Sequence, residues 1–95
     1  MKFTWYNDPA HGWLRVPIVA VVQVGASENI TPYSYMHGQY AYLEEDQDAS
    51  TFIKAWKEFT EDPIEFSERY TDNPSKIRSY ASYNHEHAEI IAVFT

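Results

Sequence analysis

Residues 33–60 read YSYMHGQYAYLEEDQDASTFIKAWKEFT, and this stretch decides the fold. Its first part, residues 33–44, has tyrosines at alternate positions on either side of a histidine-glycine pair, which is typical of two strands joined by a tight turn. Its second part, residues 48–60, repeats large apolar residues at helical spacing. A hairpin followed directly by a helix predicts a mixed fold in which the helix covers the hairpin.

The hairpin pattern also predicts which side chains share a face. A two-residue turn at His37-Gly38 places Met36 and Gln39 on one face and four tyrosines on the other, in the pairs Tyr35/Tyr40 and Tyr33/Tyr42. A loop one or two residues longer is the alternative, because histidine-glycine is not the strongest turn pair. We expect two or three of these rings to form core under the helix, with their hydroxyls at its rim.

The helix pattern has a clear start and end. Asp48 can accept hydrogen bonds from the first free backbone N–H groups, Phe52, Trp56 and Phe59 form an apolar stripe, and Pro63 prevents continuation. The remaining segments predict an α+β domain spanning residues 1–95, with a mostly antiparallel sheet of about 4–5 strands packed on this helix. Strands or extended segments are predicted at 2–6, 13–16, 64–70, 76–83 and 88–94, and residues 17–24 fit a second short helix or a buried strand.

The composition limits the class of protein. There is no cysteine, so the sequence excludes disulfides, thiolate nucleophiles and thiolate zinc sites. The longest apolar run, residues 16–22, is too short to cross a bilayer, and we expect a cytoplasmic protein with no membrane partner. A chain of 95 residues buries a modest core, and its 16 aromatic rings or formation of a homodimer would compensate.

The net charge of −7 comes from one quarter of the chain, since residues 44–68 hold nine carboxylates and two lysines while the remainder is balanced. Only the first carboxylates are explained by the helix N-terminus, where negative charge is favourable. The cluster predicts a partner protein with a basic surface and disfavours direct nucleic-acid binding. We therefore assign partner binding to Glu44, Glu45, Asp46, Asp48, Glu58, Glu61, Asp62, Glu65 and Glu68.

Catalysis has little support in the sequence. No nucleophile elbow, triad spacing or phosphate loop is present, so we lean against an enzyme and predict no cofactor. His85-Glu86-His87 is a weak metal pattern, and we predict no metal site. The alternative to a protein-binding surface is a pocket for a small ligand or nucleotide, with an arginine as anion anchor, formed by His11, Trp13, Tyr33, Tyr35, Tyr40, Tyr42 and Arg78.

A stacking platform for single-stranded nucleic acid is a further use of the tyrosines. The sequence disfavours it, because the hairpin runs into acidic residues and no base lies between Arg15 and Lys54. The later basic residues Arg69, Lys76 and Arg78 are interleaved with tyrosines. For the arginines we favour ion pairing with the acidic region, of the same chain or of a second copy, over phosphate binding.

Four stretches together resemble a family of small uncharacterised proteins of bacteriophages and prophages. They are WYNDPAHGWLRVP at 5–17, ITPYSY at 30–35, YLEEDQDA at 42–49 and IRSY at 77–80. The family has no established activity, so the resemblance assigns no residue a role. It implies a phage-type modulator or inhibitor that binds a nucleic-acid-handling or defence-related host protein, in some cases by nucleic-acid mimicry. A minor structural or assembly role in the virion is the other alternative.

Overall fold

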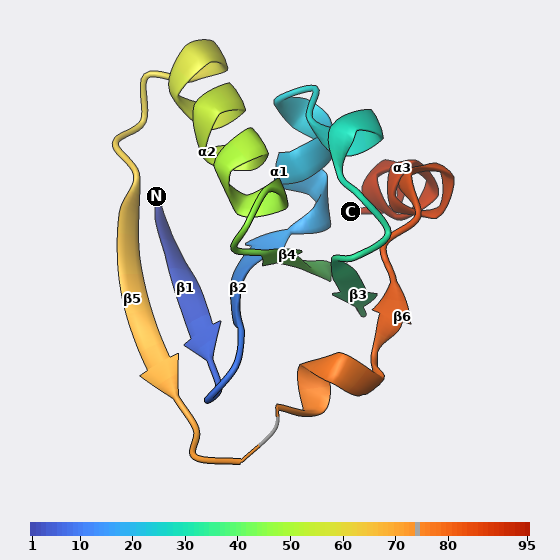
Figure 1. Cartoon of the computed structure of the whole chain (residues 1–95). Coiled ribbons are helices and arrows are strands. Elements are labelled where there is room, and N and C mark those ends of the chain that lie inside the picture. The colour runs from blue at the N-terminus through green and yellow to red at the C-terminus, as the bar shows by residue number, and fades with distance from the viewer. Residues whose placement is uncertain (74) are drawn as a thin grey trace.

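The computed structural model describes residues 1–73 and 75–95 and places six strands in one sheet (Figure 1). The predicted α+β class is confirmed, whereas the mostly antiparallel sheet of four or five strands is not, because the sheet has six strands and includes a parallel pair. In chain order the elements are β1 (Lys2–Asn7), β2 (Gly12–Pro17), α1 (Ile18–Gln23), η1 (Ser27–Asn29), β3 (Tyr35–His37), β4 (Tyr40–Glu44), α2 (Asp48–Phe59), β5 (Glu65–Tyr70), η2 (Lys76–Ser79), β6 (Ala81–Ser82) and α3 (His85–Val93).

The strand order is β5-β1-β2-β4-β3-β6. Strand β5 runs parallel to β1 because the chain leaves β4, crosses through α2 and returns at the far edge of the sheet. In this pairing Thr4 lies opposite Ser67, and their hydroxyl oxygens are 2.9 Å apart. The same register places Arg69 opposite Tyr6, which brings a base from the second half of the chain beside a ring from the first strand.

The hairpin has a different register from the predicted one. Tyr35 pairs with Tyr42, and the turn consists of Gly38 and Gln39, so the predicted turn at His37-Gly38 is wrong. The turn takes its glycine at the first central position, where φ is 59° and a side chain would be strained. Because the pairing shifts by two residues, the strand tyrosines still share one face.

Within the ambiguous segment 17–24, residues 18–23 form the short helix α1 rather than a strand. Ile18, Ala20 and Val21 are buried on its inner side. Gly25 follows the helix with φ 75°, which fits the left-handed residue that often ends a helix. Pro17 ends β2 in an extended conformation and directly precedes the helix.

The C-terminal prediction of a closing strand at 88–94 is wrong, because residues 88–93 belong to helix α3 and Phe94 follows its end. Asn84 starts the helix by accepting a hydrogen bond from the backbone N–H of His87 at 3.0 Å. Ala88 is buried and Ile91 packs on the core, three residues apart on one side of the helix. The predicted extended segment at 76–83 is instead the single turn η2 followed by the two-residue strand β6.

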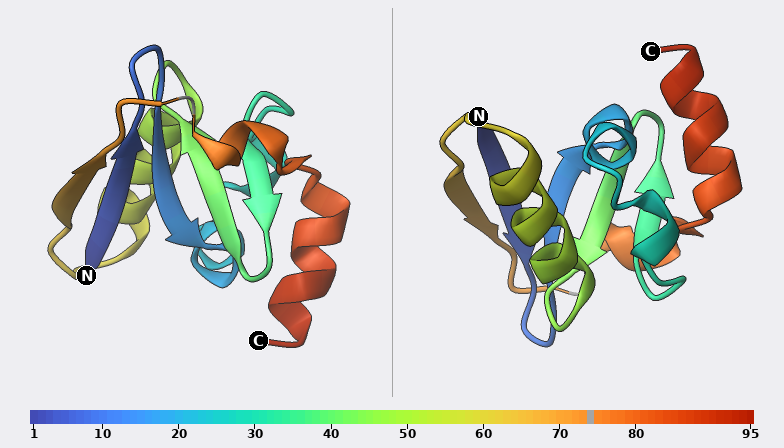
Figure 2. Two further views of the ribbon diagram at one scale, coloured as in Figure 1. Left: turned by 90° about the horizontal axis from the view of Figure 1, so that it is seen from below. Right: turned by 90° about the horizontal axis from the view of Figure 1, so that it is seen from above.

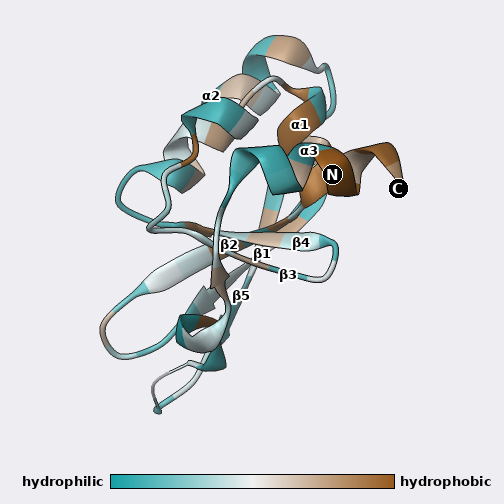
Figure 3. Cartoon of the chain, turned by 90° about the vertical axis from the view of Figure 1, so that its right-hand side faces the viewer, coloured by the Kyte–Doolittle hydropathy of each residue, from teal (hydrophilic) through white to brown (hydrophobic). Residues whose placement is uncertain are grey.

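The sheet has two different faces. Helices α1 and α2 cover one face, and α3 packs against α1 at its edge, whereas η2 lies on the opposite side (Figures 2 and 3). We call these the covered face and the open face. The main core fills the covered face, where Phe52 of α2 has no exposed surface and contacts Phe3 of β1 at a ring distance of 5.4 Å.

Candidate functional site

The open face carries the polar and aromatic half of each strand. Trp13 and Leu14 illustrate the alternation, since Leu14 enters the main core while Trp13 joins a separate cluster on the other side. The face thereby receives aromatic rings from four strands and two arginines from β2 and β5. Strand registers and side-chain contacts assign to it Lys2, Thr4, Tyr6, Trp13, Arg15, Tyr35, His37, Tyr40, Tyr42, Glu44, Glu65, Ser67 and Arg69.

A second, smaller apolar cluster forms where η2 crosses this face. Ile77 of η2 is buried with Trp13 and Tyr42, and Tyr6, Tyr35 and Tyr80 pack around them. Burial raises the pKa of the Tyr42 hydroxyl, with the neighbouring Tyr80 as the next cause. The prediction that tyrosines lie in the core under the helix is therefore wrong, because their rings pack on the side away from the helices.

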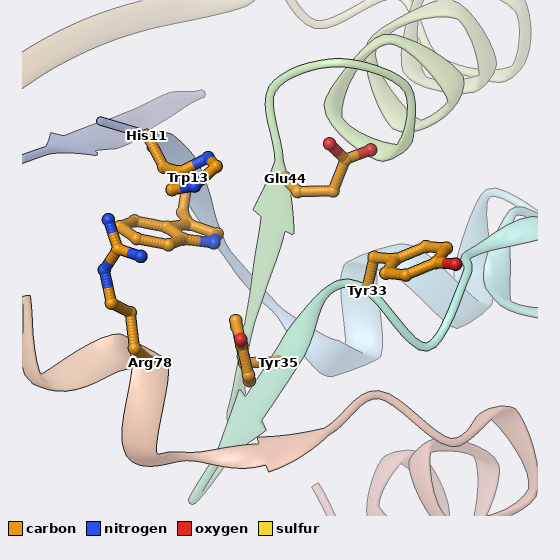
Figure 4. Close-up of a pocket in the computed structure, with 6 residues that line it drawn as sticks. All are labelled: His11, Trp13, Tyr33, Tyr35, Glu44 and Arg78. Atoms are coloured by element: carbon orange, nitrogen blue, oxygen red, sulfur yellow. The ribbon is translucent and has the colours of Figure 1, made fainter.

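Beside this cluster lies a cavity of about 240 Å³, which we call the Trp13 cavity (Figure 4). The indole of Trp13 forms its wall, with the His11 ring at a centroid distance of 5.9 Å and the Tyr35 ring at 6.3 Å. The guanidinium carbon of Arg78 lies 5.6 Å from the Trp13 ring centre. The complete lining is His11, Trp13, Tyr33, Tyr35, Glu44 and Arg78.

A buried carboxylate holds Arg78 in this position. Asp8 accepts hydrogen bonds from Nε and Nη2 of Arg78 at 2.9 and 3.1 Å, and its side chain has no exposed surface. It also accepts backbone N–H groups of Ala10, His11 and Ser75, so one carboxylate joins the β1–β2 turn to the segment before η2. The Arg78 guanidinium, followed by the Ser75 N–H, holds the pKa of Asp8 well below its usual range.

Glu44, the register partner of Trp13 on β4, also lines the cavity, and its carboxylate is turned toward the start of α2 (Figure 4). Its two carboxylate oxygens accept the backbone N–H groups of Asp46, Gln47 and Asp48 at 3.0, 2.8 and 3.1 Å. These amides belong to the turn before α2 and to its first residue, so the end of the helix fixes the Glu44 side chain and favours its negative charge. The cavity thus has a positioned acceptor in its lining.

The Trp13 indole supplies a donor to the same cavity. The residue is only 3% exposed, and its Nε1 points into the cavity (Figure 4). Among the described residues the indole N–H group that donates a hydrogen bond is that of Trp56, to the Asp62 carbonyl at 3.0 Å, and Trp13 makes no such bond. A buried ring with an unused N–H directed at a cavity is a group that a ligand can satisfy.

The predicted ligand pocket can be compared with the cavity residue by residue. His11, Trp13, Tyr33, Tyr35 and Arg78 line it, from segments up to 67 residues apart in the chain, and Tyr33 is exposed at its rim. Tyr40 and Tyr42 lie on the same face but do not line the cavity. The sequence did not identify Glu44 as a cavity residue, because it is followed by acidic residues and was grouped with them as a charged surface.

The predicted acidic surface is only partly exposed. Asp48 is completely buried, because it accepts the Thr31 backbone N–H and the Thr31 and Ser34 hydroxyls, the latter at 2.5 Å. It therefore belongs to the interior and is wrong as a partner-binding residue. The other predicted residues besides the partly buried Glu44 are exposed, namely Glu45, Asp46, Glu58, Glu61, Asp62, Glu65 and Glu68.

The predicted pairing of Arg78 with the acidic region of the same chain is wrong, because Arg78 pairs with Asp8. Within residues 1–73 and 75–95 the remaining ion pair joins His85 to Glu89 at 3.0 Å. That pair and Glu28 bring three metal-type donor atoms within 4.8 Å of one another on the exposed side of α3 and η1. The hydrogen bond with Glu89, and then the charges of nearby glutamates, raise the pKa of His85, which favours a protonated ring over a metal ligand.

No helix among the described residues is long and apolar enough to span a membrane. The chain matches no family model, and no curated protein or solved structure is detectably similar to it. The resemblance to small phage proteins stays a prediction, and its four stretches all contribute residues to the Trp13 cavity.

Proposed function

We propose that the protein is a ligand-binding domain whose Trp13 cavity takes a planar ring of the nucleobase class. The observation that carries the proposal is the N–H of the buried Trp13 ring, which has no protein partner among the described residues and opens on a cavity that the neighbouring Glu44 also lines. Nucleobases present acceptors and donors on one edge, and this arrangement offers a partner for each.

The rest of the lining supports the same ligand class. A cavity of about 240 Å³ is slightly smaller than typical small-molecule sites and suits one ring system. Rings of His11 and Tyr35 can stack on a base, and Arg78, already held by Asp8, keeps its Nη1 edge for an acceptor. The polar groups are fixed before binding, which lowers the entropic cost of association.

The indole signals in a ¹H–¹⁵N NMR spectrum test this directly, because the chain has three tryptophans. Titration with the common nucleosides should move the Trp13 Nε1 signal downfield for at least one of them. Trp13→Phe keeps a ring but removes the N–H, and should weaken binding about tenfold. The matched control is Trp5→Phe, which lies on the covered face and should not alter affinity. Equal shifts of all indole signals, or no shift with any nucleoside, would overturn the proposal.

The acidic surface supports a second candidate, a phage-type modulator that docks on a basic host protein. The specific observation is that Glu58, Glu61, Asp62, Glu65 and Glu68 are exposed and, within the described part of the chain, form no ion pair within 4 Å. Unpaired carboxylates leave the local field available to steer a basic partner.

Capture from a host lysate at low salt and at about 0.5 M salt tests this candidate, because salt screens such attraction. Reversing Glu61, Asp62 and Glu65 to lysine should abolish capture. A matched reversal of Glu28, Glu86 and Glu89, which changes the net charge equally, should retain it. Equal capture by both variants and at both salt concentrations argues against an acidic docking surface.

A further inference from the structure

The open face has a second hollow on the other side of Ile77, which we call the Tyr6 groove. It consists of two adjoining cavities of about 200 and 260 Å³ that share Tyr6 and Ser75. Their combined lining is Tyr6, Asn7, Arg15, Tyr42, Arg69, Tyr70, Thr71, Ser75, Lys76, Ile77 and Tyr80.

The charge of this lining is opposite to that of the molecule. Arg15, Arg69 and Lys76 contribute three positive charges, and no carboxylate lines either cavity. None of the three forms an ion pair within 4 Å in the described part of the chain. In a protein with net charge −7, three unpaired cations in one hollow form a local site for an anion.

Aromatic rings separate these cations. The guanidinium of Arg15 lies over two rings, 5.3 Å from the centre of Tyr6 and 4.8 Å from that of Tyr40. Such stacking fixes the guanidinium plane and leaves its N–H edge for an oxygen ligand. Tyr70 at the groove is 67% exposed, so its ring is accessible for stacking. Alternating cations and exposed rings are the chemistry of single-stranded nucleic-acid binding.

We infer that the Tyr6 groove binds the phosphates of a short single strand, one base of which enters the Trp13 cavity. The inference rests on the proposed function, which it deepens from a nucleobase to a strand. Helix η2 connects the two sites, because Lys76 lines the groove and Arg78 lines the Trp13 cavity. The sequence argument against nucleic acid rested on the acidic residues after the hairpin and on the lack of basic residues near the tyrosines. The parallel β1–β5 pairing and η2 remove the second of these objections, because they bring Arg69 and Lys76 to the groove.

Binding should depend on salt to a defined extent. Three phosphate contacts predict a fall of log K with log salt with a slope of about −2, because each neutralised phosphate of a single strand contributes about −0.7. The acidic remainder of the molecule opposes a long strand, so affinity should saturate at a few nucleotides.

Fluorescence anisotropy with labelled single-stranded pentanucleotides of mixed sequence measures this affinity. Arg69→Gln with Lys76→Gln should weaken binding at least tenfold and reduce the salt slope by about 1.4, two contacts at about 0.7 each. The matched control is Lys54→Gln with Lys57→Gln on α2, which removes the same charge from the far side and should change affinity less than twofold. Thermal unfolding of both variants verifies that they remain folded.

Competition with unlabelled nucleoside, mononucleotide, pentanucleotide and duplex distinguishes a single phosphate from a strand as the ligand. It also separates the proposed base cavity from the inferred strand groove. A 5′-mononucleotide should compete better than its nucleoside, and the pentanucleotide better than both. Equal affinity of nucleoside and pentanucleotide would overturn the strand inference but leave the base cavity intact. Pentanucleotide binding that depends on the groove residues but is unchanged in Trp13→Phe would contradict the proposed base site and would support the groove alone. Equal or tighter binding of a duplex would overturn the inference.

Discussion

The two faces of the sheet are made by the same strands but have different chemistry. The covered face is apolar and closed, with Leu14, Val16 and Leu43 almost without exposed surface under the helices. The open face has one small buried cluster, two hollows and several rings that reach the surface. The comparison indicates a division of roles, in which the covered face supplies stability and the open face keeps large aromatic groups available for contact.

The largest expected effect tests that division directly. Phe52→Ala removes a fully buried ring from the covered face and should lower the free energy of unfolding by about 3–5 kcal/mol. Tyr40→Ala removes a ring that is 41% exposed on the open face and should cost about 1 kcal/mol or less. Urea denaturation measures both values. Comparable losses would show that the open face is part of the stabilising core.

The next effect concerns the contact that joins the two faces. Asp48→Ala removes the acceptor of the Thr31 and Ser34 hydroxyls and should lower the free energy of unfolding by about 3 kcal/mol. Because Ser34 also accepts the Glu44 N–H, the Trp13 cavity should loosen as well. Asp46→Ala, an exposed carboxylate two residues away, is the control and should change stability by about 0.5 kcal/mol or less. Equal losses in the two variants would contradict a structural role for Asp48.

Low pH should lower the free energy of unfolding through protonation of Asp8, which holds Arg78 on the open face. The pKa of Asp8 is lowered in the folded protein, so the unfolded chain takes up the proton first as the pH falls. The stability due to this carboxylate is complete above about pH 5 and decreases progressively below about pH 4. Asp8→Asn should therefore flatten the dependence of the unfolding free energy on pH between about 4.5 and 2.5, whereas exposed Asp72→Asn should leave it as in the wild type. An unchanged slope in Asp8→Asn would contradict the role of this contact.

The smallest effect should appear in alkali. Burial raises the pKa of Tyr42, so above about pH 10 the unfolded chain loses this proton more readily and stability falls. Tyr42→Phe should reduce that fall, as measured by denaturation at pH 9 and pH 11. The second buried hydroxyl, Tyr83, also has a raised pKa and should remain in the variant, so a partial reduction is expected. No reduction would indicate that Tyr42 is accessible to solvent.

The sequence predicted the fold class, the main helix α2 and the strands β1 and β2, because each of these depends on a local pattern. Helix α2 starts at Asp48 and stops before Pro63 as predicted, with Phe52 and Trp56 buried, although Phe59 of the predicted stripe is exposed. The predicted cap at Asp48 is wrong, because Asp48 accepts from Thr31 and Ser34 while Glu44 accepts the amides at the helix start. Helix α3 was missed because apolar residues lie on its outer as well as its inner side, with Ile90, Val93 and Phe94 exposed, so the helical period is weak. The His85–Glu89 pair at helical spacing was a signal that could have identified it.

The candidate site was only partly predictable for a different reason. Five cavity residues were named because histidine, tryptophan and arginine are chemically conspicuous. The Asp8–Arg78 pair and the Tyr6 groove depend on contacts between residues about 60–70 positions apart, which no local pattern contains. The local charge count suggested repulsion of nucleic acid because it could not show that Arg69 and Lys76 return to the tyrosines.

The parallel pairing of β1 with β5 has a consequence for the order in which the molecule assembles. Strand β2 begins five residues after β1 ends, whereas β5 begins only at Glu65, so closing the second pair costs more chain entropy. We expect β5 to dock late during refolding and to open first in native-state hydrogen exchange. An opened β5 takes Arg69 and Tyr70 away from the groove while β2 and β4 still hold Trp13 and Glu44 in place. A ligand that contacts both sites would therefore fasten the least stable edge of the sheet, and slower amide exchange in β5 would report its binding.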